Sequence, residues 1–263
     1  MIPSALVTEW RDRVPWPSDE QVEQDLIIGR AIVELFRRSE IRNWLAVRGG
    51  TALAKLCLDR PHRYSEDIDL VQLRAEPIGP TLNAMREVLD SWLGTPSWKR
   101  SHASVKLIYR IGLGADSASE RKLKLEINTR EHESILGLAM RPLAIESRWF
   151  TGRAEVTTYE LDELLATKLR ALYQRKKGRD LFDLATAGNL AEVDPQRVVA
   201  CFVGYIEREG RRISRLEFEA NLAAKIQDRD FLADVPALVA AGTEFDATQA
   251  AHRVREDFLA RLP

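Results

Sequence analysis

The chain has 263 residues, of which 45% are hydrophobic and 30% are charged, so it can bury a sizeable core in one or two domains. Its 39 Lys and Arg residues nearly balance its 40 Asp and Glu residues, which excludes the strongly basic composition of a general nucleic-acid-binding protein. Because the sequence has no apolar stretch of about 20 residues and no signal-peptide pattern at its start, we expect a cytoplasmic protein.

The first predicted element is a helix over residues 18–38, with Ser18 as its N-cap. A short buried strand then ends at residues 45–47, and the turn Gly49-Gly50 leads into a helix that begins at Thr51. The first amides of a helix lack intrahelical acceptors and carry partial positive charge, and glycine allows close approach to the main chain. We therefore expect this turn to bind phosphate.

Two carboxylates follow on a predicted strand, within Arg63-Tyr-Ser65-Glu-Asp67-Ile-Asp69. The two-residue period of a strand places Asp67 and Asp69 on one face. Carboxylates this close repel each other unless a cation lies between them, so the pattern favours a divalent ion such as Mg²⁺. The alternative is a polar strand edge without a ligand.

A helix is predicted over residues 80–93, followed by a hairpin of residues 105–111 and 122–128 with a loop over 112–119. Alternation in the second hairpin strand places Glu126 on its polar face, so Glu126 is the candidate for a third metal ligand or a base beside Asp67 and Asp69. The alternative is an exposed strand with a solvated Lys/Glu face.

Thr157-Thr-Tyr-Glu160 has the pattern of a capping box and predicts the start of a long helix. Residues 153–158 are expected to lead into this helix. Lys168 lies on the apolar stripe of this helix, where lysine is unusual. A buried ammonium needs a counter-charge, and we favour a triphosphate contact. The alternative is a lysine whose stem covers apolar surface while its head reaches water.

The segment Gly178-Arg179-Asp180 opens the next predicted helix. Asp180 and Asp183, and Arg179 and Asp183, are neighbours at helical spacing. Asp180 can serve as an ordinary first-turn acid that stabilises the helix dipole. The alternative is that Arg179 and Asp180 position a nucleotide and Lys168, while Asp183 forms an ion pair.

The rest of the chain is predicted to be helical. Asp194 and Pro195 form an N-cap with proline at the first helical position. The predicted helices cover residues 195–207, 214–226, 230–240 and 245–260. Together these elements predict an α+β protein with a small mixed sheet and flanking helices in residues 1–155, followed by a helical domain in residues 156–263.

The blocks around Gly49-Gly50-Thr51, Asp67-Ile-Asp69 and Lys168 to Asp183 resemble those of the AbiEii/MenT nucleotidyltransferase toxins. The resemblance covers about residues 45–184. It departs at Glu126, where many relatives carry Asp.

The resemblance implies a metal-dependent nucleotidyltransferase that releases pyrophosphate from a nucleoside triphosphate. The acceptor would be the 3′ end of an RNA, with tRNA as the leading candidate. The protein would act as a toxin that is paired with an antitoxin. Asp67, Asp69 and Glu126 would hold Mg²⁺ or Mn²⁺. The nucleotide would be bound by Gly49, Gly50, Thr51, Ser65, Lys168, Arg179 and Asp180.

Three alternatives stay open. The acceptor can be a protein hydroxyl or a small molecule such as an antibiotic. The chain can be a nucleotide-binding module without catalysis. It can also be an α+β protein whose resemblance is structural alone.

Local basic clusters bear on the acceptor. One cluster is Trp98-Lys99-Arg100-Ser-His102, in which an aromatic ring next to basic residues could stack on a base, and other clusters lie within residues 170–179 and 208–215. Each can equally be a solvated face. Cys57 and Cys201 lie in apolar contexts and predict buried, reduced thiols, and the four scattered histidines do not have zinc-ligand spacing.

Overall fold

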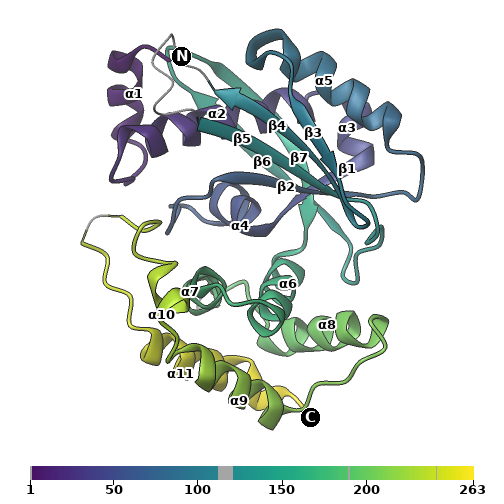
Figure 1. Cartoon of the computed structure of the whole chain (residues 1–263), viewed down its shortest axis with the longest axis vertical. Helices are drawn as coiled ribbons and strands as arrows, with labels where there is room; N and C mark the ends of the chain where they lie inside the picture. The colour runs from purple at the N-terminus through teal and green to yellow at the C-terminus, as the bar shows by residue number, and fades with distance from the viewer. Residues whose placement is uncertain (1, 112–120, 189, 241) are drawn as a thin grey trace. The chain divides into compact units, whose positions relative to one another are not determined.

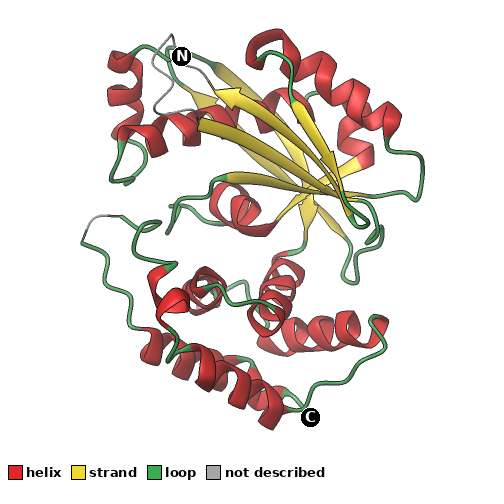
Figure 2. Cartoon of the chain, in the orientation of Figure 1, coloured by secondary structure: helices red, strands yellow, loops and turns green. Residues whose placement is uncertain are grey.

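The computed structural model of the chain describes residues 2–111, 121–188, 190–240 and 242–263. It divides into two compact units. The first comprises Met1–Ser134 and Leu138–Tyr159, and the second comprises Ile135–Gly137 and Glu160–Pro263. All seven strands of the sheet belong to the first unit, and the second is built from helices (Figures 1 and 2).

The first unit is organised around one mixed sheet of seven strands in the order β3-β4-β5-β2-β1-β7-β6. The strands are β1 (Leu45–Arg48), β2 (Asp67–Gln72), β3 (Ser97–Arg100), β4 (Ser104–Ile111), β5 (Arg121–Asn128), β6 (Leu138–Glu146) and β7 (Thr151–Tyr159). The β2–β5 and β1–β7 pairs are parallel and the other pairs are antiparallel. The predicted mixed sheet is confirmed, and so is the antiparallel pairing of residues 105–111 with residues 122–128, which begins one residue earlier, at Arg121. The predicted loop over residues 112–119 lies outside the described residues.

Among its described residues, the first unit also contains four helices besides the glycine turn, which are α1 (Ser4–Arg11), α2 (Asp19–Phe36), α3 (Ser39–Trp44) and α5 (Gly79–Leu93). Helix α2 packs against β7 and β6, and α5 packs against β4. The start of α2 is as predicted, because the Ser18 hydroxyl accepts from the Gln21 N–H and the Gln21 side chain accepts from the Ser18 N–H.

The glycine turn begins its helix earlier than predicted. Helix α4 covers Gly49–Ala52, and a π-helical turn over Leu53–Cys57 continues it. A single π turn of this kind is a frequent feature near functional sites.

The second unit contains α6 (Leu161–Gln174), α7 (Gly178–Ala187), α8 (Pro195–Arg208), α9 (Arg215–Lys225), α10 (Arg229–Ala233) and α11 (Ala247–Asp257), and a short 3-10 turn at Leu259–Arg261. The apolar stripe of α6 is buried as predicted, with Leu165, Leu169 and Leu172 fully covered. The Asp194 side chain accepts from the N–H groups of Gln196 and Arg197, which confirms the proline-containing N-cap of α8.

The predicted capping box at Thr157–Glu160 is wrong. Thr157 and Thr158 belong to β7, and α6 begins at Leu161 with Glu160 as an N-cap that makes no side-chain capping bond. The hydroxyl groups of the two threonines instead donate to the main-chain oxygens of Arg42 and Val47. Because β-branched residues suit a strand, tertiary pairing decides the conformation here rather than the local capping pattern.

The helix predicted over residues 230–240 ends early, at Ala233. Pro236 disfavours helical backbone at Val235, so the chain leaves the helix just before this pair. Strands β3, β6 and β7 and the short helices α1 and α3 were not predicted, and β3 is an edge strand whose four residues are all exposed.

Cys201 is buried as predicted, whereas Cys57 is only partly buried, and the two do not form a disulfide bond. Among the described residues, no helix is both long enough and apolar enough to cross a membrane.

Candidate active site

The carboxylate face of the sheet is set by the register of three adjacent strands. Arg48 of β1 lies opposite Asp69 of β2, and Asp69 lies opposite Glu126 of β5. Asp67 lies opposite Lys124 on the same two strands. Adjacent strands are separated by about 4.8 Å and alternate residues share a face, so the three predicted carboxylates lie on one surface. The opposite face is core, since Ile68 and Leu125 are fully buried.

Asp67 is half-buried and paired with a lysine. The Lys124 ammonium lies 2.5 Å from Asp67 Oδ2. Burial raises the pKa of the Asp67 carboxyl above its ordinary value, although the hydrogen bond and charge of Lys124 act in the opposite direction. Because this carboxylate is costly to ionise in place, a bound cation would stabilise it.

Glu126 is engaged by its own neighbours. Its Oε1 accepts from the Ser104 hydroxyl at 2.9 Å, and its Oε2 lies 2.9 Å from Lys106 Nζ and 3.9 Å from Lys124 Nζ. Burial by itself raises the pKa of Glu126, but the hydrogen bonds from Lys106 and Ser104 outweigh it, so the pKa lies below its ordinary value. Within the described part of the chain, no three His, Cys, Asp or Glu side chains form a ready-made metal cluster.

The glycine turn packs directly on the carboxylate face. Gly49 has φ of +75°, and a Cβ atom placed on it would lie 2.6 Å from Asp69 Oδ2. Only glycine therefore suits both the left-handed backbone and the close approach of Asp69. A Cβ atom on Gly50 would collide with the guanidinium group of Arg63, which is itself buried and donates to the Tyr64 carbonyl at 2.9 Å.

Thr51 and Ser65 connect this turn to the carboxylate strand. The buried Thr51 hydroxyl lies 2.5 Å from the Asp67 carbonyl oxygen and 2.8 Å from the Ser65 hydroxyl. Their side chains thus hold the α4 turn against β2. Any phosphate contact at these positions would fall to the main chain or to the partly exposed Ser65.

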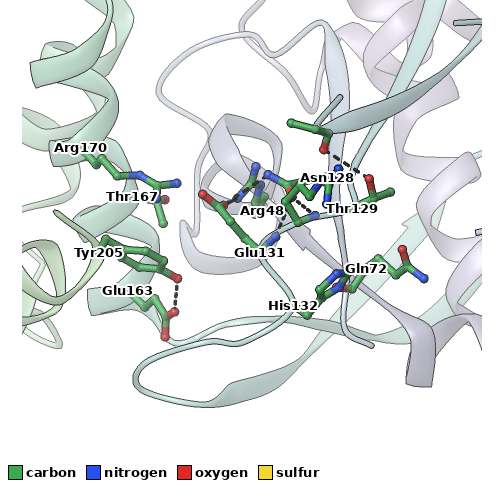
Figure 3. Close-up of polar contacts among 12 residues, drawn as sticks. Arg48, Gln72, Asn128, Thr129, Glu131, His132, Glu163, Thr167, Arg170 and Tyr205 are labelled. Carbon is green, nitrogen blue, oxygen red and sulfur yellow. Dashed lines mark hydrogen bonds and ion pairs between the residues drawn. The ribbon is translucent and has the colours of Figure 1, made fainter. Parts of the chain in front are cut away.

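Sequence reasoning missed the polar group at the β1 end of this face. Arg48 Nη1 lies 2.6 Å from Glu131 Oε2, and the Asn128 amide also donates to that oxygen at 3.4 Å (Figure 3). Burial acts to lower the pKa of Arg48, but the charge of Glu131 outweighs it and the pKa is raised. Glu131 follows β5 in an irregular segment, so no periodic pattern could have identified it.

In the second unit, Lys168 is buried as predicted, but its head does not reach water. Its side chain is 6% exposed, and Nζ lies 2.7 Å from Asp183 Oδ2 and 3.2 Å from Asp180 Oδ1. The alternative of a lysine that extends to solvent is therefore wrong. The expected ion pair of Asp183 is present, with Lys168 as its partner.

Asp180 is fully buried and holds two cations. Besides Lys168, it accepts a two-point interaction from Arg175, with Nε to Oδ2 at 2.7 Å and Nη2 to Oδ1 at 2.8 Å. Burial by itself raises the pKa of Asp180, but the charge of Lys168 and the bonds from Arg175 outweigh it, so the pKa lies below its ordinary value. Arg175 lies inside a basic run of the sequence, where no local pattern indicates that it binds Asp180.

Arg179 interacts with Asp234 of the same unit. Its main-chain N–H donates to Asp234 Oδ2 at 3.1 Å, and its guanidinium Nε lies 3.7 Å from the same oxygen. Lys177 also pairs with Asp234, at 3.3 Å. Asp234 thus holds the start of α7 through two basic residues.

Glu163 is a further buried carboxylate of the second unit. It accepts from the main-chain N–H groups of Ile135 and Leu136 at 2.8 and 2.7 Å, and from the Tyr205 hydroxyl at 2.5 Å (Figure 3). Its oxygens tie the segment Ile135–Gly137 to α6 and α8, so its role is structural.

Two solved structures share this fold. The nucleotidyltransferase toxin MenT4 from Mycobacterium tuberculosis H37Rv has a TM-score of 0.67 and 19% identity, and the match covers 100% of this chain and 91% of that one. A nucleotidyltransferase described as putative from H. pylori has a TM-score of 0.56 and 18% identity, and the match covers 91% of this chain and 93% of that one. A search of curated proteins finds no match.

A family model gives the more specific result. The model of the nucleotidyl transferase AbiEii toxin, type IV toxin–antitoxin system, matches residues 30–253. This range contains both the carboxylate face of the first unit and the Lys168–Asp180–Asp183 cluster of the second. The chain therefore belongs to the AbiEii family of nucleotidyltransferase toxins.

Proposed function

We propose that the protein transfers a nucleoside monophosphate from a nucleoside triphosphate to the 3′ end of an RNA, with tRNA as the leading acceptor, and that Mg²⁺ or Mn²⁺ supports the reaction. The observation that carries this proposal is the packing of Gly49 on Asp69, in register with Arg48 and Glu126. This packing brings main-chain N–H groups and paired carboxylates to the same point.

The donor set fits a hard divalent cation. Mg²⁺ usually takes one or two protein carboxylates and completes its shell with water and substrate phosphates. Asp67 and Asp69, on one face of β2, are such a pair. Glu126 fits less well while its two oxygens accept from Ser104 and Lys106, so we assign it as the third carboxylate beside the ion rather than as its main ligand.

When bound, the ion would neutralise charge on the triphosphate and stabilise the charge that develops in transfer. Asp67 and Asp69 would hold it. The main-chain N–H groups of Gly49 and Gly50 would face phosphate oxygens, while Thr51 and Ser65 hold the turn in place. The acceptor oxygen would attack the α-phosphorus of the nucleoside triphosphate. The bond between the α- and β-phosphates would break, and pyrophosphate would leave.

The second unit would supply cationic groups for the nucleotide. We assign triphosphate contact to Lys168, which would require its buried ammonium to leave Asp180 or Asp183. Arg179 would contribute from the start of α7, positioned by Asp234. A separately encoded antitoxin would be the biological partner, as the family description implies.

The test is incubation of the purified protein with each of the four α-labelled nucleoside triphosphates, Mg²⁺ and either total RNA or RNA-free cell extract. Label in RNA that extends a 3′ end by one or a few nucleotides on a sequencing gel supports the proposal. If label appears only in protein or only in small molecules, the acceptor is not RNA and belongs to that other class. A lack of pyrophosphate release with every nucleotide and fraction would contradict the transfer itself.

A further inference from the structure

The carboxylate face continues into a basic surface on the far side of β5. Five cationic side chains share its polar face by strand alternation. They are Lys99 of β3, Lys106 and Arg110 of β4, and Lys122 and Lys124 of β5. We call these five residues the basic flank, and the three strands that carry them lie side by side in the sheet (Figure 1).

Strand register connects the basic flank to the carboxylates in a continuous row. Asp69 lies opposite Glu126, Glu126 opposite Lys106, and Lys106 opposite Lys99. Three strand spacings of about 4.8 Å separate Asp69 from Lys99, which is a path of roughly 14 Å across the sheet. A molecule that reaches the carboxylates from this side must pass over the basic flank.

Two members of the flank carry charge that no described residue neutralises. Lys106 and Lys124 are paired with Glu126 and Asp67. Lys99 and Lys122 are exposed and form no ion pair with any residue that the structure describes. Lys99, at the far end of the row, and Lys122, on β5, therefore leave this flank with excess positive charge.

Two other groups of basic residues are neutralised by their neighbours. On the β1 side of the carboxylates, the charge of Arg48 is neutralised by Glu131. In the second unit, the basic run that ends α6 is also paired internally, because Arg175 binds Asp180, Lys176 binds Asp228 and Lys177 binds Asp234.

We propose that the basic flank binds the phosphate backbone of the acceptor RNA strand just upstream of its 3′ end, with the exposed Lys99 and Lys122 among the contacts. This inference rests on the proposed function, because it takes RNA as the acceptor. Exposed lysines bind phosphates without reading sequence, so the flank would position the strand and leave base choice to other residues. Removing them should weaken RNA binding and leave nucleotide binding intact.

The experiment measures binding of a fluorescent single-stranded RNA to the full chain between 50 and 200 mM salt, for wild type and for Lys99→Ala/Lys122→Ala. Each lost phosphate contact lowers the salt slope by about 0.7 for a single strand, so the double variant should lose a slope of about 1.4. Over this salt range, wild-type affinity should therefore fall about sevenfold more than variant affinity. Arg100→Ala is the matched control, since Arg100 is an exposed cation on the opposite face of β3.

The outcomes separate this inference from the proposed function. An unchanged salt slope and an unchanged RNA affinity in Lys99→Ala/Lys122→Ala would contradict RNA binding by the basic flank, even if the protein labels RNA. An equal loss in Arg100→Ala would also overturn it, because the effect would then be one of net charge. A loss of affinity for a nonhydrolysable nucleotide in the double variant, with RNA affinity intact, would assign the flank to the triphosphate and overturn the inference.

Discussion

The two clusters of charged side chains in this protein differ in how their charges are balanced. On the sheet, Asp67 is half-buried and the pKa of its carboxyl is raised, chiefly by burial. In the helical unit, Asp180 is fully buried, yet its pKa is lowered, because Lys168 and Arg175 outweigh the cost of burial. The charge of Asp67 is thus incompletely compensated by its neighbours, and our proposal supplies the remainder with a metal ion, whereas Asp180 already holds two cations.

This difference separates the expected roles. A carboxylate whose ionised form is poorly stabilised by the protein gains from a bound metal, so its removal should affect activity more than stability. A buried carboxylate that binds two cations stabilises the fold, and removal of Asp180 leaves the buried Lys168 ammonium with one of its two carboxylates. Substitutions in each cluster therefore test whether the sheet carboxylates serve activity and the helical carboxylates serve stability.

The largest effect is expected on catalysis, from Asp69→Asn. Loss of one anionic ligand should lower the rate of nucleotide transfer roughly 10³-fold, because the charge that develops in the transition state loses its stabilising ion. Single-turnover assays with Mg²⁺ measure the rate, and thermal unfolding should show little change. Asp12→Asn, which changes an exposed carboxylate of the same unit, is the control and should retain full activity.

The next effect is on stability, from Asp180→Ala. Removing one partner of a buried ion pair typically costs about 3–5 kcal/mol, and here Lys168 would lose one of its two carboxylates. Urea unfolding measures this free energy. Asp230→Ala, at an exposed first-turn acid of α10, should cost much less. Equal unfolding free energies for the two variants would show that the helical cluster does not stabilise the fold.

A smaller effect is expected from Gly49→Ala. Placing alanine at a left-handed backbone position costs about 1–2 kcal/mol, and its Cβ would also press on Asp69. Gly210→Ala is the control, because Gly210 has φ of +71° and a Cβ atom placed on it would have nothing within 4 Å. Both variants should lose similar stability, while Gly49→Ala alone should reduce nucleotide transfer, by about tenfold or more. Equal transfer rates would mean that the contact with Asp69 does not matter for activity.

The smallest effect is a pH dependence of opposite sign at the two clusters. The folded pKa of Asp180 is lowered, so its stabilisation is present above the ordinary Asp value of about 3.9 and is lost as pH falls through the folded value. The folded pKa of Asp67 is raised, so its contribution favours the fold below about 3.9 and is lost as pH rises through the folded value. At neutral pH, Asp180→Asn should therefore destabilise the protein and Asp67→Asn should not. Urea unfolding between pH 3 and 8 tests this, and the same sign for both variants would contradict it.

Strand alternation was sufficient to predict that Asp67 and Asp69 share one face of their strand and that Glu126 lies on the polar face of its own strand, because a two-residue period is a local property. Their lysine partners could not be predicted, since the pairing of Lys124 with Asp67 and of Lys106 with Glu126 depends on which strands are adjacent and in what register. For the same reason the burial of Lys168 followed from its helical stripe, but the identity of its partners required the packing of α6 on α7.

The missed strands have a related cause. In β6, the sequence Leu138-Ala-Met-Arg-Pro142 shows no regular alternation, and its first five residues are exposed or half-buried. In β7, Thr157 and Thr158 mimic a helix cap. Only the pairing of these two strands with each other and of β7 with β1 makes them part of the sheet, and that pairing is not encoded in any short segment.

The most direct test of the central claim is the effect of Mg²⁺ on nucleotide binding, because it does not depend on the acceptor. Calorimetric titration with a nonhydrolysable nucleoside triphosphate would be done with and without Mg²⁺, for wild type and for Asp67→Asn/Asp69→Asn. We predict that Mg²⁺ strengthens binding to wild type and leaves binding to the variant unchanged. The same gain in affinity for both proteins, or no effect of Mg²⁺ on wild type, would contradict a metal-dependent site at Asp67 and Asp69.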